Sequence, residues 1–215
     1  MTAVIVLEDE ADYGLSQSIT VSKEAVAQPE DFGDLKIEEG LSVENLLHIM
    51  LIESSNDAAY ALAEKIGVEN FVERMNQRAE ILGLAKTYFI NPTGLDLENS
   101  EEPNNYSSAT DLAKLAQYIL DYHPIIFEIS SKSLYEVLDN SGSPHHLVIN
   151  KNELLTSFSE NIVGGKTGFT YKAGGCILLV LKDKKGNFFI NVILGTESRE
   201  ASFEEMKKII DWLET

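Results

Sequence analysis

Two short motifs contain the residues of this chain whose types and spacing could do chemistry. Ser-Ser-Asn occupies positions 54–56 after a strongly apolar segment, and Lys-Thr-Gly occupies positions 166–168, after two glycines and before a long apolar segment. A serine beside a base can pass on a proton, and an asparagine amide can hold a peptide backbone. A lysine with a hydroxyl on a strand edge can bind the C-terminal carboxylate of an extended peptide, and glycines leave room for that approach.

Neither motif is specific by itself. Ser-x-Asn is a common helix-cap pattern, and Lys-Thr-Gly occurs often by chance, so a structural role is the better interpretation of either one alone. The two motifs lie in this order about 110 residues apart, one ending a predicted buried helix and the other beginning a predicted core strand, which makes the pair more specific.

The elements that must position the motifs are predicted from the hydropathy pattern. The β propensity of Val4, Ile5 and Val6 favours a strand over residues 1–7, although a buried helix end fits so short an apolar run equally well. Residues 9–40 are acidic and contain turn residues, which predicts short surface strands and turns. From Ser42 the apolar residues fall on nearly every face of a helix, so we expect a buried helix that ends at the capping residue types of positions 53–57.

The middle of the chain has helical periodicity. Helices are predicted over residues 58–63, over 68–82, where Gly83 ends the helix, and over 112–120, with a stop near Pro124. Residues 41 to about 129 therefore form a helical block.

The last third changes to the period of strands. Strands are predicted over 134–138 and 147–149, and two longer apolar strands over 176–181 and 188–194 are joined as a hairpin and covered on both faces by helices. Ser202-x-x-Glu205 is a capping box that is expected to open a closing helix. The predicted fold class is α+β, with a helical lobe packed on an antiparallel sheet and a C-terminal helix, in one domain spanning residues 1–215.

Composition excludes several classes of function. The net charge of −18 and the pI of about 4.5 disfavour nucleic acid and anionic lipid as partners. No apolar stretch is long enough to span a membrane, and the first residues lack the basic region and cleavage site of a signal peptide, so the printed chain by itself would stay in the cytoplasm. Arginine is scarce, with Arg74, Arg78 and Arg199 alone, so the position of each is informative.

Metal and thiol chemistry have little support. Cys176 is the one cysteine, so no intrachain disulfide forms, and its apolar surroundings predict a small buried hydrophobe rather than a reactive thiol. His145 and His146 could suggest a metal pair, but neighbours on a strand point to opposite faces, so a surface or edge position is expected. We predict no metal site and no cofactor. The acidic run 98–102 is most simply a solvated loop.

Longer segments around the two motifs have a recognisable pattern, at positions 40–59, 91–96, 108–113, 150–155 and 164–174. Together they resemble the S11 family of serine-type D-alanyl-D-alanine carboxypeptidases, and Gly-Gly-Lys-Thr-Gly-Phe-Thr at 164–170 is the strongest match. The resemblance covers essentially the whole chain. It implies the β-lactamase/D,D-peptidase-like fold, removal of terminal D-Ala from peptidoglycan stem peptides, β-lactams as further ligands, and a location in the periplasm or cell envelope.

The resemblance also implies a role for each matching residue. Ser54 would relay a proton, the Asn56 amide would hold the substrate, and Lys166 would polarise the site. Thr167 and Gly168 complete the Lys-Thr-Gly motif, in which the threonine would bind the terminal carboxylate.

Two further residues follow from the same resemblance. The backbone N–H of Phe169 would supply half of an oxyanion hole. Arg199 matches the carboxylate-binding arginine of the family, and the alternative for it is a solvated surface arginine.

One departure from the family pattern outweighs the matches. In the family a Ser-x-x-Lys motif, which provides the nucleophile, closely precedes Met-Thr-Ala, and here Met-Thr-Ala is residues 1–3. No serine of the printed chain has a lysine three positions later. We therefore expect the nucleophile, its lysine and its oxyanion N–H to be absent, together with the first helix and first two strands of the family fold, and residues 1–7 to be the rest of the nucleophile helix.

Three interpretations of the function of the chain follow. The chain is a truncated enzyme, predicted inactive as given, or a non-catalytic binder of D-Ala-terminated peptides or partner subunit with the same fold. A class A β-lactamase is disfavoured, because no segment between the motifs resembles the glutamate-bearing loop of that family.

Overall fold

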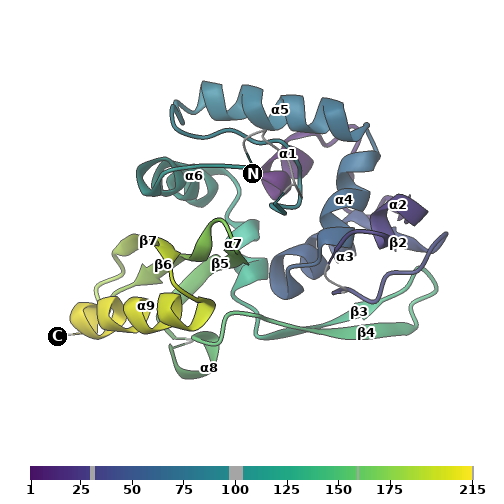
Figure 1. The fold of residues 1–215 in the computed structure, drawn as a ribbon. Helices are drawn as coiled ribbons and strands as arrows, with labels where there is room; N and C mark the ends of the chain where they lie inside the picture. The colour runs from purple at the N-terminus through teal and green to yellow at the C-terminus, as the bar shows by residue number, and fades with distance from the viewer. Residues whose placement is uncertain (30–31, 97–103, 159, 215) are drawn as a thin grey trace.

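Helices form one side of the molecule and a three-stranded sheet the other, in a computed structural model that describes residues 1–29, 32–96, 104–158 and 160–214 (Figure 1). The helical side contains α1 (Thr2–Glu8), α2 (Lys23–Val26), α3 (Val43–His48), the π-helix η1 (Ile49–Glu53), α4 (Asn56–Glu64), α5 (Val68–Ile81), α6 (Ala109–Tyr122) and α7 (Ile125–Ser130). Two short strands, β1 (Ser18–Thr20) and β2 (Gly40–Ser42), pair antiparallel beside it. The predicted α+β class is confirmed, and the predicted loop at 98–102 lies outside the described residues.

Residues 2–8 form a helix, so the strand favoured by propensity is wrong and the helix implied by the resemblance is confirmed. Val4 and Val6 are fully buried, and α1 packs against α4 and α5. Burial against neighbouring helices stabilises this helix more than the weak β propensity of valine and isoleucine opposes it.

The helix predicted from Ser42 begins where expected and changes type before it ends. The hydroxyl of Ser42 accepts a hydrogen bond from the N–H of Asn45 and caps α3. The last turn, η1, is a π-helix, and it ends at Ser54, whose backbone is left-handed with φ 67°. The next residue, Ser55, caps α4 by accepting the N–H of Ala58, so the capping cluster turns the chain sharply between two helices.

The sheet consists of β5 (Ile162–Thr170), β6 (Gly174–Lys182) and β7 (Phe188–Thr196), in the antiparallel order β5-β6-β7. The predicted hairpin of the two long strands is confirmed. On β6, Ile177 and Leu179 face the C-terminal helix α9 (Arg199–Glu214), while Val180 belongs to the core of the helical side. Helices therefore cover both faces, with α9 on one and α6 and α7 on the other, and among the described residues β7 pairs only with β6.

The capping box predicted to open the last helix is wrong by one turn. The helix begins at Arg199, and the hydroxyl of Ser198 accepts the N–H of Ala201 as its cap. The Ser202 hydroxyl instead donates to the carbonyl of Arg199 inside the first turn. The earlier start places Arg199 itself in the first turn of the helix.

A second hairpin, of β3 (Leu134–Leu138) and β4 (Pro144–Ile149), runs beneath α3 (Figure 1). Its register shifts after Val137, which pairs with His146, so that Leu138 pairs with Pro144. His145 is thus the extra residue of a β-bulge, and the two histidines lie side by side instead of on opposite faces. A short helix α8 (Leu155–Phe158) connects this hairpin to β5.

No helix in the described part of the chain is long and apolar enough to cross a bilayer.

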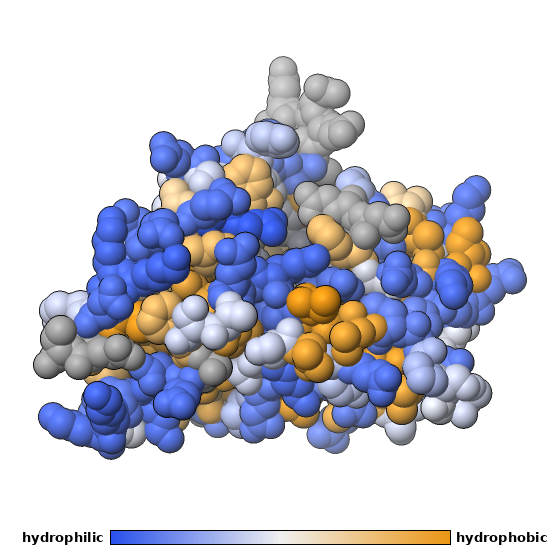
Figure 2. All heavy atoms as spheres, turned by 90° about the horizontal axis from the view of Figure 1, so that it is seen from below, coloured by the Kyte–Doolittle hydropathy of each residue, from blue (hydrophilic) through white to orange (hydrophobic). Residues whose placement is uncertain are grey.

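The surface seen from below is mostly hydrophilic, with separate hydrophobic patches between the polar side chains (Figure 2). The β3–β4 hairpin contributes several large apolar side chains to the exposed surface of the protein, among them Leu134, Leu147 and Ile149. Scattered exposed apolar residues are normal for a folded domain and do not by themselves indicate a site.

Gly164 allows α7 to lie directly on β5. A Cβ built at Gly164 would lie 2.6 Å from both the Cβ and the carbonyl oxygen of Phe127, whereas a Cβ at Gly168 would meet nothing within 4 Å. Because α7 cannot move away without uncovering the core, the first change overpacks the interface and the second does not.

We therefore expect Gly164→Ala to lower the free energy of unfolding by about 1–3 kcal/mol. Gly168→Ala, the matched control on the same strand, is expected to change it by about 0.5 kcal/mol or less. Urea denaturation of both variants measures the difference. Equal losses of stability would contradict this account of the α7–β5 contact.

Candidate active site

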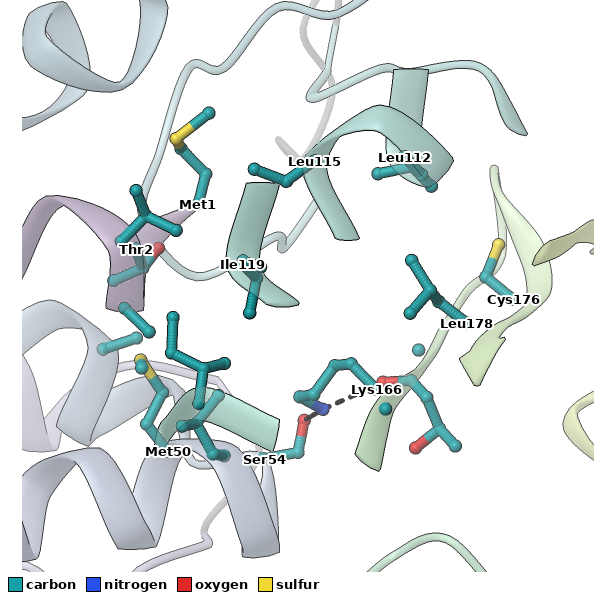
Figure 3. A pocket seen from close by; sticks show the side chains of 18 of the residues that line it. Met1, Thr2, Met50, Ser54, Leu112, Leu115, Ile119, Lys166, Cys176 and Leu178 are labelled. Atoms are coloured by element: carbon teal, nitrogen blue, oxygen red, sulfur yellow. Dashed lines mark hydrogen bonds between the residues drawn. The ribbon is translucent and has the colours of Figure 1, made fainter. Parts of the chain in front are cut away.

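The two sequence motifs meet at a hydrogen bond between the sheet and the helical side. The Lys166 ammonium on β5 donates to the Ser54 hydroxyl at 2.7 Å and to the carbonyl of Thr167 at 2.9 Å. Figure 3 shows the two side chains pointing toward one another, Lys166 from the strand and Ser54 from the end of η1. Two motifs about 110 residues apart in the sequence therefore meet in one cleft.

The electrostatics of Lys166 follow from where it lies. Burial removes water from its ammonium and lowers its pKa from 10.5 to about 8, and the positive charge of Arg199 acts in the same direction. Near neutral pH the side chain is thus still a cation, yet its proton is held less tightly than on an exposed lysine. A lysine of this kind can bind an anion and can also give a proton to a hydroxyl beside it.

A cleft of about 680 Å³ is lined by every residue to which the family resemblance gave a role. What each of these residues does stays a prediction. Lining the cleft are Ser54, Asn56, Lys166, Thr167, Gly168, Phe169 and Arg199. Arg199 is partly buried and lines the cleft, and its positive charge contributes to the lowered pKa of Lys166.

The Asn56 amide is partly engaged by the protein itself. Asn56 is the first residue of α4 and is buried, and its Nδ2 donates to the carbonyl of Pro29 at 2.9 Å. This bond fixes the orientation of the amide at the cleft wall. Thr167, also buried, lines the same cleft one residue beyond Lys166.

A second cavity, of about 360 Å³, adjoins the first and is mostly apolar. Met1 and Thr2 from the start of α1, Leu112 and Leu115 from α6, and Leu178 from β6 surround it, as Figure 3 shows. The polar pair of serine and lysine lines both cavities, so it lies where the apolar and polar parts of the site join.

The position of Cys176 corrects the sequence-based prediction. It is not a fully buried core residue, because it is only partly buried and lines both cavities. Cys176 pairs with Gly168 across the strands, and a glycine leaves the neighbouring surface of the sheet uncovered. The apolar run around the cysteine gave no sign of this opening.

The structure adds cleft residues that sequence reasoning missed. The ammonium of Lys151 lies 4.1 Å from the centre of the Phe32 ring, and both residues line the cleft with Asn56. Asp96, whose carboxylate accepts the N–H of Lys172, lines the same cleft. The segments around Asp96 and Lys151 matched the family pattern, but the pattern did not indicate that their side chains face the site.

The cleft can therefore bind a carboxylate and move a proton. Among the described lining residues, Ser54 is the serine whose hydroxyl is within hydrogen-bonding distance of an amine, since the Ser55 hydroxyl caps α4 and that of Ser107 is bonded to Thr87. No group of three or more histidine, cysteine, aspartate or glutamate side chains that could hold a metal occurs in the described chain. The arrangement of hydroxyl, amine and guanidinium is of the kind that serves acyl transfer.

Comparison with known proteins agrees with this geometry. Residues 1–198 match the family described as D-alanyl-D-alanine carboxypeptidase, peptidase S11. The chain is 33% identical over 217 residues to the D-alanyl-D-alanine carboxypeptidase DacF of Bacillus subtilis, covering 99% of this chain and 53% of that protein. The chain spans about half the length of this relative and of two further D-alanyl-D-alanine carboxypeptidases, from Haemophilus influenzae and Escherichia coli.

Solved structures share the fold. A point mutant of the Streptomyces K15 DD-transpeptidase superposes with a TM-score of 0.85 at 27% identity, covering 99% of this chain and 84% of that one. Penicillin-binding protein D2 of Listeria monocytogenes, in its cefotaxime-bound form, gives a TM-score of 0.82 at 27% identity, with 98% and 82% covered. Both motifs lie in one cleft, and the family match covers residues 1–198 of the chain. The chain therefore belongs to the D-alanyl-D-alanine carboxypeptidase family of serine peptidases, S11.

Proposed function

We propose that the protein is a serine-type D-alanyl-D-alanine carboxypeptidase that acts on peptidoglycan stem peptides outside the cytoplasm. Residues 1–215 are then one incomplete domain that supplies the carboxylate-binding and proton-relay part of the active site. The observation that supports this most directly is the 2.7 Å contact between Lys166 and Ser54, with Arg199 close by in the same cleft.

The chemistry of this part of the site follows from its groups. The terminal carboxylate of the peptide binds Arg199 and the hydroxyl of Thr167, and the Lys166 ammonium adds a second positive charge. When the peptide bond breaks, the leaving D-Ala nitrogen needs a proton. Ser54 gives its hydroxyl proton to that nitrogen and takes one from Lys166, so the pair ends one proton poorer and the amine one proton richer.

Two further groups hold the rest of the substrate. The Asn56 amide, oriented by Pro29, binds the peptide backbone, and the N–H of Phe169 faces the oxygen that becomes negative in the transition state. β-Lactams present a carboxylate beside a reactive carbonyl, so the same groups fit them. The cefotaxime-bound state of the Listeria relative supports this extension.

Acylation itself needs groups that the 215 residues do not contain. A serine becomes a nucleophile when a base takes its proton, and no serine here has a lysine three positions later. Ser54 has a basic neighbour, but its proposed role is proton relay.

We expect the 215-residue polypeptide to form no covalent adduct with a fluorescent penicillin, because it lacks the nucleophile pair. Denaturing electrophoresis and intact mass after incubation measure this, with Ser54→Ala as the matched variant. Adduct in the wild type but not in Ser54→Ala would identify Ser54 as a nucleophile and contradict the relay role. Adding an upstream segment with Ser-x-x-Lys should restore labelling, and its failure in a folded protein would favour a non-catalytic binder.

Non-covalent binding of an N-acetylated peptide ending in D-Ala-D-Ala should weaken as pH rises through about 8. The pKa of Lys166 is lowered to about 8, so above that pH the free site loses the ammonium that the carboxylate needs, and binding then requires proton uptake. Each further pH unit should lower the affinity by up to about tenfold until the bound-state pKa is reached.

Calorimetric titrations between about pH 7.5 and 10 test this, with three variants. Lys166→Ala should remove the pH dependence, whereas Arg199→Ala should weaken binding by about tenfold or more and keep the dependence, with its midpoint moved to higher pH because the charge of Arg199 no longer lowers the pKa of Lys166. Lys208→Ala, on α9 away from the cleft, should match the wild type. Affinity that does not change with pH in the wild type would contradict the assignment of Lys166 to the carboxylate.

A further inference from the structure

The bulge in the β3–β4 hairpin brings two neighbouring imidazoles into direct contact. Nδ1 of His145 lies 2.6 Å from Nδ1 of His146, with the ring planes 65° apart. In a regular strand these side chains would point to opposite faces, so the contact depends on the extra residue at position 145.

Each end of the pair meets a carboxylate. Nε2 of His145 lies 2.9 Å from Glu39, in the turn before β2, and Nε2 of His146 lies 3.3 Å from Glu53, the last residue of η1. The four side chains are between 7% and 18% exposed. They form one largely buried row from the turn, across the hairpin, to the end of η1.

The number of protons in this row follows from its contacts. A neutral imidazole has one N–H, so two neutral rings supply two protons, whereas three consecutive hydrogen bonds need three. Two neutral rings with two ionised carboxylates therefore leave one of the three contacts without a proton. All three contacts are hydrogen bonds only when the four groups together hold one additional proton. A further proton would place two N–H groups against each other at 2.6 Å, and the contact between the rings would have to open.

Ser54 directly follows Glu53, which is the last residue of this row. Its left-handed backbone is unfavourable for a residue other than glycine, so the surrounding structure must hold it. Before it, Glu53 is bonded to His146, and the carbonyl of Ile52 accepts the N–H of Lys151 at 3.2 Å. After it, Ser55 caps α4. Of these three attachments, the one through Glu53 changes with protonation.

We propose that His145 and His146 are positioning residues, which share one proton through their Nδ1 atoms and, through Glu53, hold Ser54 against Lys166. Addition of a second proton separates the rings, releases Glu53 and weakens the contact of Ser54 with Lys166. The consequence for substrate binding rests on the proposed function, whereas the shared proton and its effect on Ser54 do not.

Other titratable groups lie on the elements packed around the pair. They are Lys36 and Glu38 before β2, Glu44 and His48 on α3, and Tyr135, Glu136 and Asp139 on the hairpin. Burial lowers the pKa of His48, and hydrogen bonds from Ser141 and Ser143 lower the pKa of Asp139. Both therefore change charge at more acidic pH than their unperturbed counterparts, and ring-by-ring spectra separate His48 from the pair.

The test is a titration of the ligand-free 215-residue chain by ¹⁵N-edited NMR between about pH 5 and 8. Near neutral pH we expect both Nε2 atoms to be protonated and one strongly deshielded proton to couple to both Nδ1 atoms. On acidification the shared signal should disappear and the Ser54 amide signal should move with the same midpoint. Independent titration of the two rings would overturn the proposal, and so would a Ser54 amide signal that does not move when the rings are protonated.

A matched pair of variants separates positioning from packing. In His146→Gln the side-chain nitrogen can still donate to Glu53, whereas in His146→Asn the shorter amide cannot reach it. Near neutral pH, His146→Gln should bind the D-Ala-D-Ala peptide within about twofold of wild type, and His146→Asn should lose about tenfold. Both should lose the acid-induced movement of the Ser54 signal. Equal losses of affinity in the two variants would show that the histidine only fills space.

The outcomes also separate this proposal from the function it concerns. If no variant binds the peptide but the shared proton and the linked Ser54 signal are present, the proposed function fails and the positioning role stands. If the peptide binds and its affinity and the Ser54 signal are both independent of the pair's titration, the positioning role fails. The wild-type titration decides the question even where a variant does not fold.

Discussion

The ammonium of Lys166 is buried between the sheet and the helical side, and much of the structure can be understood from what that requires. A buried cation needs hydrogen-bond acceptors, and here the Ser54 hydroxyl and the Thr167 carbonyl supply them. The first acceptor comes from a segment 112 residues away, so the strand and the end of η1 must both be placed accurately. Gly164 lets α7 lie against β5, and the turn at Ser54 brings the hydroxyl to the ammonium.

That placement is obtained with backbone of higher energy than regular helix or strand. The π-helical turn η1 and the left-handed Ser54 are each unfavourable by themselves, and both occur directly at the residue that contacts Lys166. Ser55 stabilises the far side of the turn as the cap of α4. An ordinary α-helix continued to residue 54 would leave the Ser54 hydroxyl in a different direction, so the irregular turn is what aims this side chain at the cleft.

The sequence predicted most of this architecture, and its errors have identifiable causes. Long periodic segments such as α5 and the β6–β7 hairpin were predicted because their own side chains form the core contacts. Residues 1–7 were ambiguous because tertiary burial, not propensity, makes α1 a helix. Ser198 and Ser202 are both good caps one turn apart, and the capping box favoured the wrong one. The residues of the candidate site that belong to the two motifs were predicted from the sequence. The opening beside Cys176 and the bulge at His145 were not, because they depend on strand register, which has no local signal in the sequence.

The charge distribution gives a physical reason for the site to favour a small carboxylate. The chain has a net charge of −18, yet Lys151, Lys166 and Arg199 gather in one cleft, where burial and Arg199 together lower the pKa of Lys166. Two like charges thus lie near each other, away from much of the water that would screen them. A carboxylate placed between them would convert that repulsion into attraction, while a long polyanion would also be repelled by the net negative charge of the rest of the chain. The same repulsion that lowers the pKa of Lys166 would therefore strengthen the proposed binding of a single terminal carboxylate.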